Sequence, residues 1–333
     1  MEDRLLLELW ATVSAGRAAG GRLDHEYARF GSAAAASMRE LAAGAGLEAL
    51  CRCDAAYPAA LADLGGPPAV LYVAGGRARF CDLVQGGVVA VVGTRRPSAY
   101  GVEVAHRIAR GVSASGLALA SGMAAGIDAS AHRGALAGGG RTLAVLPGCA
   151  GDPYPRANRR LHERILGSGV AISEVGAGAP VRRWSLLARN RIIAALAQLT
   201  VVVQGSERSG ALVTAAMAGE LSRPVGAVPG SVLAPQSQGP HSLLMAGAVL
   251  VRGPQDVLDA LYGVGARPAA APAVSALAPE QRALLEAIAA GADTVTALER
   301  RGREGVQLLS ALAALELAGC LRRTPGGRYV VEL

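Results

Sequence analysis

Between residues 88 and 262, short apolar runs alternate with longer amphipathic segments in a regular pattern. The segments between the runs begin with Ser, Asp, Pro or Gly, which suit helix N-termini. Such alternation predicts βαβ units, and runs such as LTVVVQ, apolar without alternation, indicate strands buried on both faces. We therefore predict an α/β fold, doubly wound, with a mainly parallel sheet. The expected strands are Val88–Val92, Leu117–Ser121, Thr142–Leu146, Val170–Ser173, Leu199–Gln204, Val225–Val228 and Ala248–Val251.

The flanking regions follow other patterns. The N-terminal stretch is helical in pattern, and a proline-punctuated connector with a short strand at Val70–Val73 leads into the alternating region. A Pro/Ala-rich stretch without periodicity follows that region and indicates a linker. The predicted regions are a small helical module (SAM- or helix-hairpin-helix-like) at 1–56, the α/β domain with its connector at 57–262, the linker at 263–278 and a winged-helix domain at 279–333.

The winged-helix prediction rests on three helical stretches near 279–290, 294–301 and 304–318, followed by a hairpin around a Pro-Gly-Gly turn. In DNA-binding versions of this arrangement the third helix contacts the bases. Here that helix contains Glu304 and Glu316 and no basic residue. We therefore expect protein contact or packing for this helix, rather than duplex binding.

The amino-acid composition and the charge distribution limit the kinds of active site and partner that the protein can have. All 33 basic residues are arginines, which excludes a P-loop lysine, a Schiff-base lysine and a lysine general base. Residues 75–262 hold 19 arginines and 10 acids, a net charge of +9. A polyanionic partner is one explanation, and an arginine-rich domain without such a partner is the other; charge alone does not decide between them.

The cysteine pattern and the N-terminal residues indicate the cellular compartment in which we expect the protein. Five cysteines form no disulfide framework, and no His or Cys pair complements Cys51 and Cys53 at zinc spacing. The first residues lack the basic stretch of a signal peptide, and no apolar run approaches membrane-spanning length. We expect reduced cysteines, no metal site, no membrane contact and a cytoplasmic location.

The segments that follow the predicted strands collect glycine turns, hydroxyls and arginines. Ligands bind beyond the C-terminal ends of the strands in open parallel sheets. Glycine lets a ligand approach the backbone, helix N-termini offer free N–H groups, and arginine grips phosphate bidentately. We predict a phosphate site, and several such turns side by side suit a polymer better than one nucleotide. The candidate residues are Gly93, Thr94, Arg95, Arg96, Ser98, Ser121, Gly122, Gly126, Tyr154, Asn158, Arg189, Asn190, Arg191, Ser209, Gly210 and Thr214.

Catalytic motifs are harder to find in this sequence. It has no Gly-x-Ser-x-Gly elbow, no His-Glu-x-x-His and no Walker-type loop. Asp128 and Glu174 would form a carboxylate pair, or bind a metal, if they converged. The interpretation we prefer is that Asp128 caps the helix that starts at Ile127. We therefore assign no catalytic residue.

Six motifs occur in a fixed order: VVGTRRPSAYG, ASGMAAGIDASAHRGAL, VLPGCAGDPYPRANRRL, ISEV with LLARNRIIAAL, SERSGALVTAAMA, and VGAVPG. Over roughly residues 57–262 this set resembles the DNA-processing protein A (DprA/Smf) family. One turn departs from the family pattern, because Gly239-Pro240-His241 stands where the family usually shows Gly-x-Asn. That substitution puts any role of this turn in question.

The resemblance implies a Rossmann-like fold, sequence-independent binding of single-stranded DNA and a homodimer formed through this domain. It also implies loading of the RecA recombinase onto single strands in natural transformation, without a cofactor or catalytic turnover; plasmid uptake and recombination repair would use the same biochemistry. Arg95 matches the family's phosphate-gripping arginine. Aromatic residues are scarce, so we expect phosphate contacts to dominate and binding to depend strongly on salt.

The alternative is a nucleotide-processing enzyme of the nucleoside-monophosphate phosphoribohydrolase type, which shares a Rossmann-like fold. That family follows a Pro-Gly-Gly-x-Gly-Thr stretch with a catalytic glutamate. In this sequence the corresponding region runs from Glu207 to Thr214, and Met217 stands where the glutamate would be. Release of a base from a nucleoside monophosphate would favour this alternative.

Overall fold

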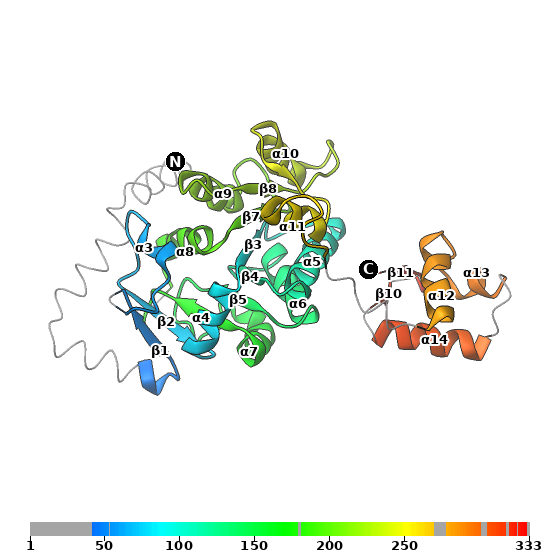
Figure 1. Cartoon of the computed structure of the whole chain (residues 1–333), viewed down its shortest axis with the longest axis horizontal. Coiled ribbons are helices and arrows are strands. Elements are labelled where there is room, and N and C mark those ends of the chain that lie inside the picture. The colour runs from blue at the N-terminus through cyan, green and yellow to red at the C-terminus, as the bar shows by residue number, and fades with distance from the viewer. Residues whose placement is uncertain are drawn as a thin grey trace. The chain divides into compact units, whose positions relative to one another are not determined.

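The computed structural model describes residues 42–52, 54–178, 181–269, 278–300, 305–317, 320–324 and 326–331 (Figure 1). The chain divides into two compact units between residues 269 and 270. Most of the helical module expected at 1–56 lies outside the described residues.

The first unit contains nine strands, and nine helices lie wholly within its described residues. The strands are β1 (Glu48–Cys51), β2 (Val70–Ala74), β3 (Val88–Val92), β4 (Ala118–Ser121), β5 (Thr142–Val145), β6 (Val170–Ser173), β7 (Leu199–Val202), β8 (Val225–Ala227) and β9 (Val249–Leu250). The helices are α3 (Ala59–Ala62), α4 (Arg77–Gln85), α5 (Ala99–Ala114), α6 (Ile127–Ala137), α7 (Arg159–Ser168), α8 (Arg183–Leu196), α9 (Gly210–Glu220), α10 (Gln238–Met245) and α11 (Pro254–Tyr262), with 3-10 turns η1 (Arg156–Asn158) and η2 (Pro235–Ser237).

All nine strands join one sheet in the order β1-β2-β6-β5-β4-β3-β7-β8-β9. The seven strands from β6 to β9 in this order are parallel, whereas β2 pairs antiparallel with β6 and β1 antiparallel with β2. From β3 the chain builds outward through β4, β5 and β6, then returns to place β7 on the other side of β3. The topological switch point of this doubly wound sheet therefore lies between β3 and β7.

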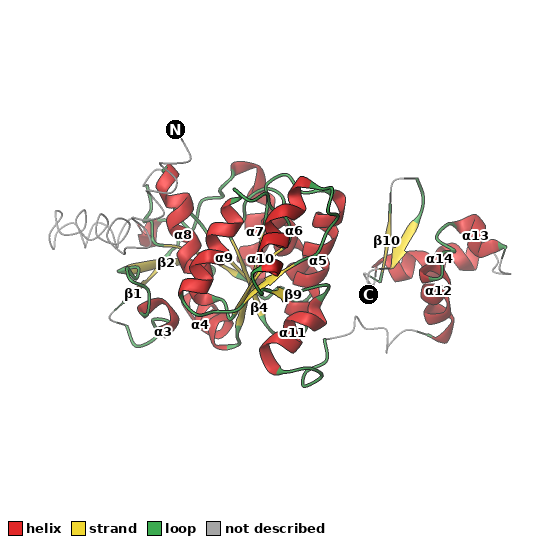
Figure 2. Cartoon of the chain, turned by 90° about the horizontal axis from the view of Figure 1, so that it is seen from above, coloured by secondary structure: helices red, strands yellow, loops and turns green. Residues whose placement is uncertain are grey.

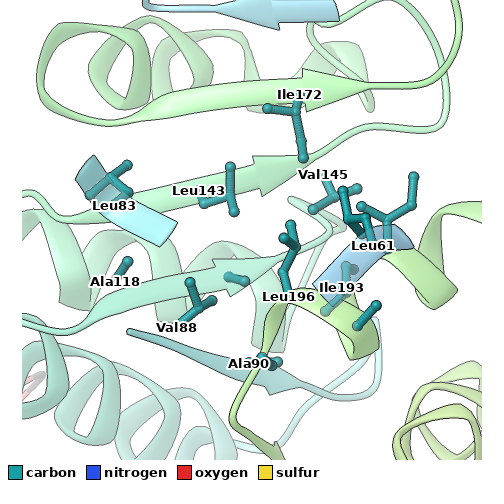
Figure 3. Packing of buried hydrophobic residues seen from close by; sticks show 14 of the residues in the cluster. Leu61, Leu83, Val88, Ala90, Ala118, Leu143, Val145, Ile172, Ile193 and Leu196 are labelled. Atoms are coloured by element: carbon teal, nitrogen blue, oxygen red, sulfur yellow. The ribbon is translucent and has the colours of Figure 1, made fainter. Parts of the chain in front are cut away.

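Helices cover both faces of the sheet (Figure 2). Successive β3 side chains point to opposite faces, as strand geometry requires. Val88, Ala90 and Val92 pack under α4, α8 and α9, whereas Val89 and Val91 pack under α5, α6 and α11. Figure 3 shows the first of these two cores, in which side chains of α8 lie against β3, β4, β5 and β6. Burial on both faces explains why the parallel strands are mostly apolar.

The structure confirms the doubly wound, mainly parallel α/β prediction. It adds β1 at residues 48–51, a strand within the segment where we expected a helical module. It also shows that part of the expected linker packs on the first unit. The Gln255 side chain donates to the Arg267 carbonyl over 3.2 Å and accepts from the Ala269 N–H over 2.7 Å.

The second unit contains α12 (Pro279–Ala289), α13 (Val295–Glu299), α14 (Gly305–Leu317) and a hairpin of β10 (Leu321–Arg323) with β11 (Tyr329–Val331). These elements fall where the sequence predicted three helices and a hairpin, and the winged-helix assignment remains a prediction. The buried face of α14 includes Leu308 and Leu312, while Val306 and Leu309 are exposed. In neither unit does a described helix combine the length and apolarity needed to cross a bilayer.

Candidate functional site

A pocket of about 380 Å³ opens at the switch point, beyond the C-terminal ends of β3 and β7. This is where doubly wound sheets bind their ligands, and the volume falls within the roughly 300–1,000 Å³ typical of ligand sites. The sheet itself therefore positions the site. The pocket is lined by Val92, Gly93, Thr94, Arg95, Arg96, Ala124, Asp128, Leu186, Leu187, Arg189, Asn190, Ile193, Ser206, Ser209, Gly210, Ala211 and Thr214.

The turn after β3, residues 93–98, is held from beneath and carries two arginines outward. We call it the arginine turn. The Thr94 N–H donates to the Gln204 carbonyl over 2.7 Å, and the Thr94 carbonyl accepts from the Ile127 N–H over 3.2 Å. At the other end of the turn, the Ser98 N–H donates to the Gln204 side chain over 3.0 Å. Arg95 and Arg96 are both exposed. Their charges therefore stand at the mouth of the pocket on a fixed backbone.

The loop after β4, residues 122–126, is clamped by three buried side chains from three different elements. Arg189 of α8 donates to the Gly122 carbonyl, and Asn158 of η1 donates to the Met123 carbonyl over 2.8 Å. The Asp128 carboxylate of α6 accepts from the Ala124 N–H over 3.4 Å. Because three consecutive residues are each anchored, this wall of the pocket has its shape before any ligand binds.

The clamped loop also fits closely against the arginine turn. Gly126 has a φ of +86°, and a Cβ at this position would collide with the Thr94 carbonyl oxygen. Gly122 has no room for a side chain either, because the Arg189 guanidinium lies against it. These two glycines are therefore required for the packing of the pocket wall.

Asp128 and Arg189 lie together at the floor, and each is only 6% exposed. Burial raises the pKa of the Asp128 carboxyl above its ordinary value, while the Arg189 charge and backbone N–H groups oppose that rise. Burial lowers the pKa of Arg189 to about 10, with Asp128 opposing this shift and Arg95 adding to it. At neutral pH Arg189 therefore keeps its charge.

The opposite wall of the pocket is the start of α9. Ser209 caps this helix, its hydroxyl accepting from the Ala211 N–H over 3.3 Å. Free N–H groups and the positive dipole end of a helix favour an anion at this position. Gly239 lies beneath the preceding turn, where its N–H donates to the Gly205 carbonyl over 2.9 Å and a Cβ would meet that same oxygen. Gly239-Pro240-His241, which differs from the family pattern, therefore lies in the first turn of α10 and supports the pocket wall through Gly239.

The structure places some of the predicted site residues in the pocket lining. The other predicted residues form contacts within the fold. Ser98 caps α5, and the Ser121 hydroxyl donates to the Val91 carbonyl over 2.7 Å inside the core. Tyr154 is half-buried, near enough to Arg189 to affect the pKa of that arginine. The predicted residues that line the pocket are Gly93, Thr94, Arg95, Arg96, Arg189, Asn190, Ser209, Gly210 and Thr214.

Arg191 is separated from the pocket although it lies in the same motif as Arg189. Its guanidinium forms a buried ion pair with Glu174, which follows β6. Glu174 is thus paired with Arg191 outside the pocket lining, whereas Asp128 lines the pocket, so the two do not form the carboxylate pair considered above. Met217, at the position of the hydrolase glutamate, is buried in a small cluster with Ala194 and Ala218.

Sequence reasoning missed several residues that matter here. The interpretation of Asp128 as the cap of α6 is wrong, because Gly126 is the N-cap of that helix and Asp128 instead accepts from the Ala124 N–H and lines the pocket floor. Gln204, which fixes both ends of the arginine turn, was not predicted. The apolar lining from Leu186, Leu187 and Ile193 was also missed. The spacing of these three residues along α8 places them on one side of the helix, a periodicity that would have identified them.

The family model for the DNA recombination-mediator protein A matches residues 48–262. The chain belongs to this family. The match begins at the first residue of β1, so the family region coincides with the sheet described here. The DprA/Smf resemblance drawn from the six motifs is thereby confirmed.

Individual members of the family agree with this assignment. The DNA processing protein DprA of Bacillus subtilis is 36% identical over 205 residues, which cover 62% of this chain and 68% of that protein. The X-ray structure of DprA from Streptococcus pneumoniae matches with a TM-score of 0.61 and 37% identity, over 65% of this chain and 74% of that one. A Helicobacter pylori DprA structure, described for its single-stranded DNA binding mode, matches with a TM-score of 0.56 and 28% identity, over 65% of this chain and 95% of that one.

Proposed function

We propose that this protein binds single-stranded DNA without sequence preference and acts as a recombination mediator that loads RecA onto the strand. The observation that carries the proposal is the pocket at the switch point, with Arg95 and Arg96 exposed at its mouth and the N-terminus of α9 on its opposite wall. The Helicobacter pylori relative, whose description concerns single-stranded DNA, supports this choice of ligand.

The phosphate chemistry favours a flexible polyanion. Exposed arginines attract phosphates through solvent, release counterions and give no base selectivity. Arg95 and Arg96 are exposed whereas Arg189 is buried, so the attraction comes mainly from the mouth and the surrounding basic surface. We therefore expect the logarithm of affinity to fall linearly with the logarithm of salt concentration, with a slope of about −0.7 per neutralised phosphate.

A homodimer formed through the β9 edge of the sheet is part of the proposal. β9 is the last strand of the sheet, and Leu250 on it is half exposed. Val232, Leu233 and Met245, in the neighbouring loop and at the end of α10, are 83%, 90% and 90% exposed. An edge strand beside several exposed apolar side chains is a surface that a second copy can cover. Replacing Leu250 by Glu should shift light-scattering mass from dimer to monomer, whereas Val264→Glu, at an exposed apolar position outside this edge, should not.

RecA loading is part of the proposal, and the family description of a recombination mediator supports it. It is tested by measuring RecA filament formation on single strands covered with a single-strand-binding protein. The protein should shorten the lag before filaments form, and a variant that cannot bind DNA should not. Natural transformation is the setting we propose, tested by transformation frequency in cells that lack the protein.

The experiment that tests DNA binding compares single-stranded with double-stranded oligonucleotides across a salt series. Single strands should bind more tightly at every salt concentration, and Arg95→Ala should weaken binding and make the salt slope less steep. Arg164→Ala is the matched control, because Arg164 is an exposed arginine on α7, outside the pocket lining. Equal affinity for the two DNA forms, or an unchanged affinity of Arg95→Ala, would refute the proposal.

A further inference from the structure

Helices α6 and α7 are neighbours on one face of the sheet and carry a strong positive charge outside the pocket (Figure 2). The exposed charged residues of α6, of α7 and of the η1 turn that leads into α7 are five arginines and one acid, a net charge of +4. The acid, Glu163, is paired with Arg159 over 3.3 Å. Within the described part of the chain, no ion pair or hydrogen bond is formed by the side chains of the other four, Arg133, Arg156, Arg160 and Arg164.

Three of these four arginines form a row on the side of α7 that faces α6. Arg156, Arg160 and Arg164 follow one another at intervals of four residues, so they lie along one side of η1 and α7. Ser168 is the next residue at this spacing. It lies beside the end of α6, because a Cβ on Gly140, just after that helix, would be 2.7 Å from the Ser168 hydroxyl oxygen.

The fourth arginine, Arg133, lies on the side of α6 that faces α7. It follows Ala129 by four residues and precedes Leu136 by three, so the three residues share one side of the helix. Ala129 and Leu136 pack in the same apolar cluster as Leu161 and Ile165 of α7. The four arginines therefore gather where the two helices meet, and we call them the α6–α7 surface.

The α6–α7 surface begins beside the pocket without being part of it. Arg156 lies two residues before Asn158, which clamps the 122–126 loop, and α7 then leads away from the end of β5 to the start of β6. The pocket lining includes none of the four arginines. A ligand on this surface can therefore be bound while the pocket is occupied.

The chemistry of the surface favours the phosphates of duplex DNA. Guanidinium groups bind phosphate bidentately. Helices α6 and α7, which are described throughout, expose no large apolar side chain, whereas protein interfaces depend on apolar and aromatic anchors and membrane-binding helices on an apolar face. A single strand gains affinity from base contacts, which this surface does not offer. A duplex keeps its bases stacked inside and presents its phosphates outward, so phosphate contacts are sufficient.

We propose that the α6–α7 surface binds the backbone of duplex DNA, without sequence preference, while the pocket holds a single strand. Duplex binding at this surface does not depend on the proposed function, whereas the simultaneous holding of both DNA forms rests on it. A protein with both sites brings a single strand next to a duplex. That arrangement is the one from which a recombinase can test the strand against the duplex.

The deciding experiment measures the affinity of the full-length protein for a fluorescent duplex before and after saturation with a short single strand. If the two sites are separate, the strand leaves the affinity for the duplex unchanged. A biotinylated short strand should then retain the fluorescent duplex only when the protein is present. Displacement of the duplex by the strand would show that both DNA forms compete for the pocket, and it would overturn the proposal.

A double variant places the duplex on the surface. Arg133→Ala with Arg160→Ala removes one arginine from each helix and should make the salt slope for the duplex less steep by about 2, because each phosphate contact contributes about 0.9. The affinity for the short strand should not change. Arg282→Ala with Arg300→Ala removes the same charge from exposed positions of the second unit and should alter neither affinity. Equal effects of the two double variants on the duplex would overturn the surface, because only net charge would then matter.

Single variants separate this surface from the proposed function. Arg95→Ala should weaken the short strand and leave the duplex unchanged, whereas Arg164→Ala, the control for the pocket, should weaken the duplex and leave the short strand unchanged. If the duplex binds through Arg133 and Arg160 but the short strand does not bind at all, the proposed function fails and the duplex surface stands. If the short strand binds and the first double variant leaves duplex binding unchanged, the duplex surface is overturned and the proposed function stands.

Discussion

Variants of the buried ion pair of Glu174 and Arg191 test whether Arg191 stabilises the fold rather than binding DNA. The side chains are 5% and 7% exposed, and one Arg191 nitrogen, Nη1, is buried without a hydrogen-bond partner. Glu174→Gln therefore leaves a buried guanidinium without its counter-charge. The phenol of Tyr57 lies nearby, but burial raises its pKa to about 12, so it stays neutral and cannot replace the carboxylate. Removing one partner of a buried ion pair typically costs about 3–5 kcal/mol.

That loss is large against the roughly 5–15 kcal/mol of total stability usual for a domain. It corresponds to a fall in melting temperature of about 6–20 °C for a domain of this size. Urea unfolding followed by circular dichroism measures the loss directly. The double variant Glu174→Leu with Arg191→Met removes both charges and should recover most of the lost stability, because apolar replacements of buried pairs are often neutral or stabilising.

The same variants test the place of Arg191 in DNA binding. Because Arg191 lies outside the pocket lining, the folded double variant should bind single-stranded DNA with the affinity and salt slope of the unaltered protein. A stable double variant that has lost DNA binding would refute the separation of Arg191 from the site. A Glu174→Gln variant that loses less than about 1 kcal/mol would refute the electrostatic argument.

Three further changes test other parts of the structure. Burial lowers the pKa of the His132 imidazole to about 3, so the folded protein resists protonation of this side chain. The stability that neutral His132 contributes is complete above the unfolded-state pKa of about 6.5. It falls as the pH drops from there towards 3. Between pH 7 and pH 5 urea unfolding should show a loss of about 2 kcal/mol that is absent in His132→Gln. Gly126→Ala should lower the melting temperature more than Gly178→Ala, because both glycines have positive φ but only Gly126 lacks space for a Cβ; equal losses would contradict the packing argument. Gln204→Leu should leave the Ser98 N–H without its acceptor, reduce stability by about 1–3 kcal/mol and weaken DNA binding without changing the salt slope.

The parallel strands could be predicted because burial on both faces leaves a local signature. Val88 to Val92 are all buried, so the run is apolar throughout, and the helix that follows starts at a capping serine. The antiparallel strand β1 left no such signature. Its four residues, Glu48 to Cys51, include two exposed ones, and its place in the sheet depends on pairing with β2 across a connector. Pairing between distant segments is not encoded in the pattern of either one alone.

The site was predicted at the level of turns but not of individual side chains. Arg189 and Arg191 share one motif, yet residues two apart on a helix point in nearly opposite directions. One arginine therefore faces the pocket and the other faces Glu174. The helical period would have separated them once α8 was recognised. The roles of Asn158 and Arg189 as clamps of the 122–126 loop could not be foreseen, because they depend on carbonyl groups supplied by a different part of the chain.

The division between exposed and buried arginines has a consequence for the proposed function. In the proposed complex Arg95 and Arg96 would act through solvent, where each charge contributes a modest attraction that salt screens. Arg189 is buried and donates to the Gly122 carbonyl, so it shapes the pocket wall. A mediator must hold a strand and then give it up to the recombinase. Burying the mouth arginines against phosphate would strengthen the grip but slow the release, since changes in affinity are expressed mainly in the dissociation rate. In the proposed function, a pocket that is formed before the ligand binds accepts the strand by its shape. The exposed arginines at its mouth hold the strand only weakly, so the recombinase can displace it.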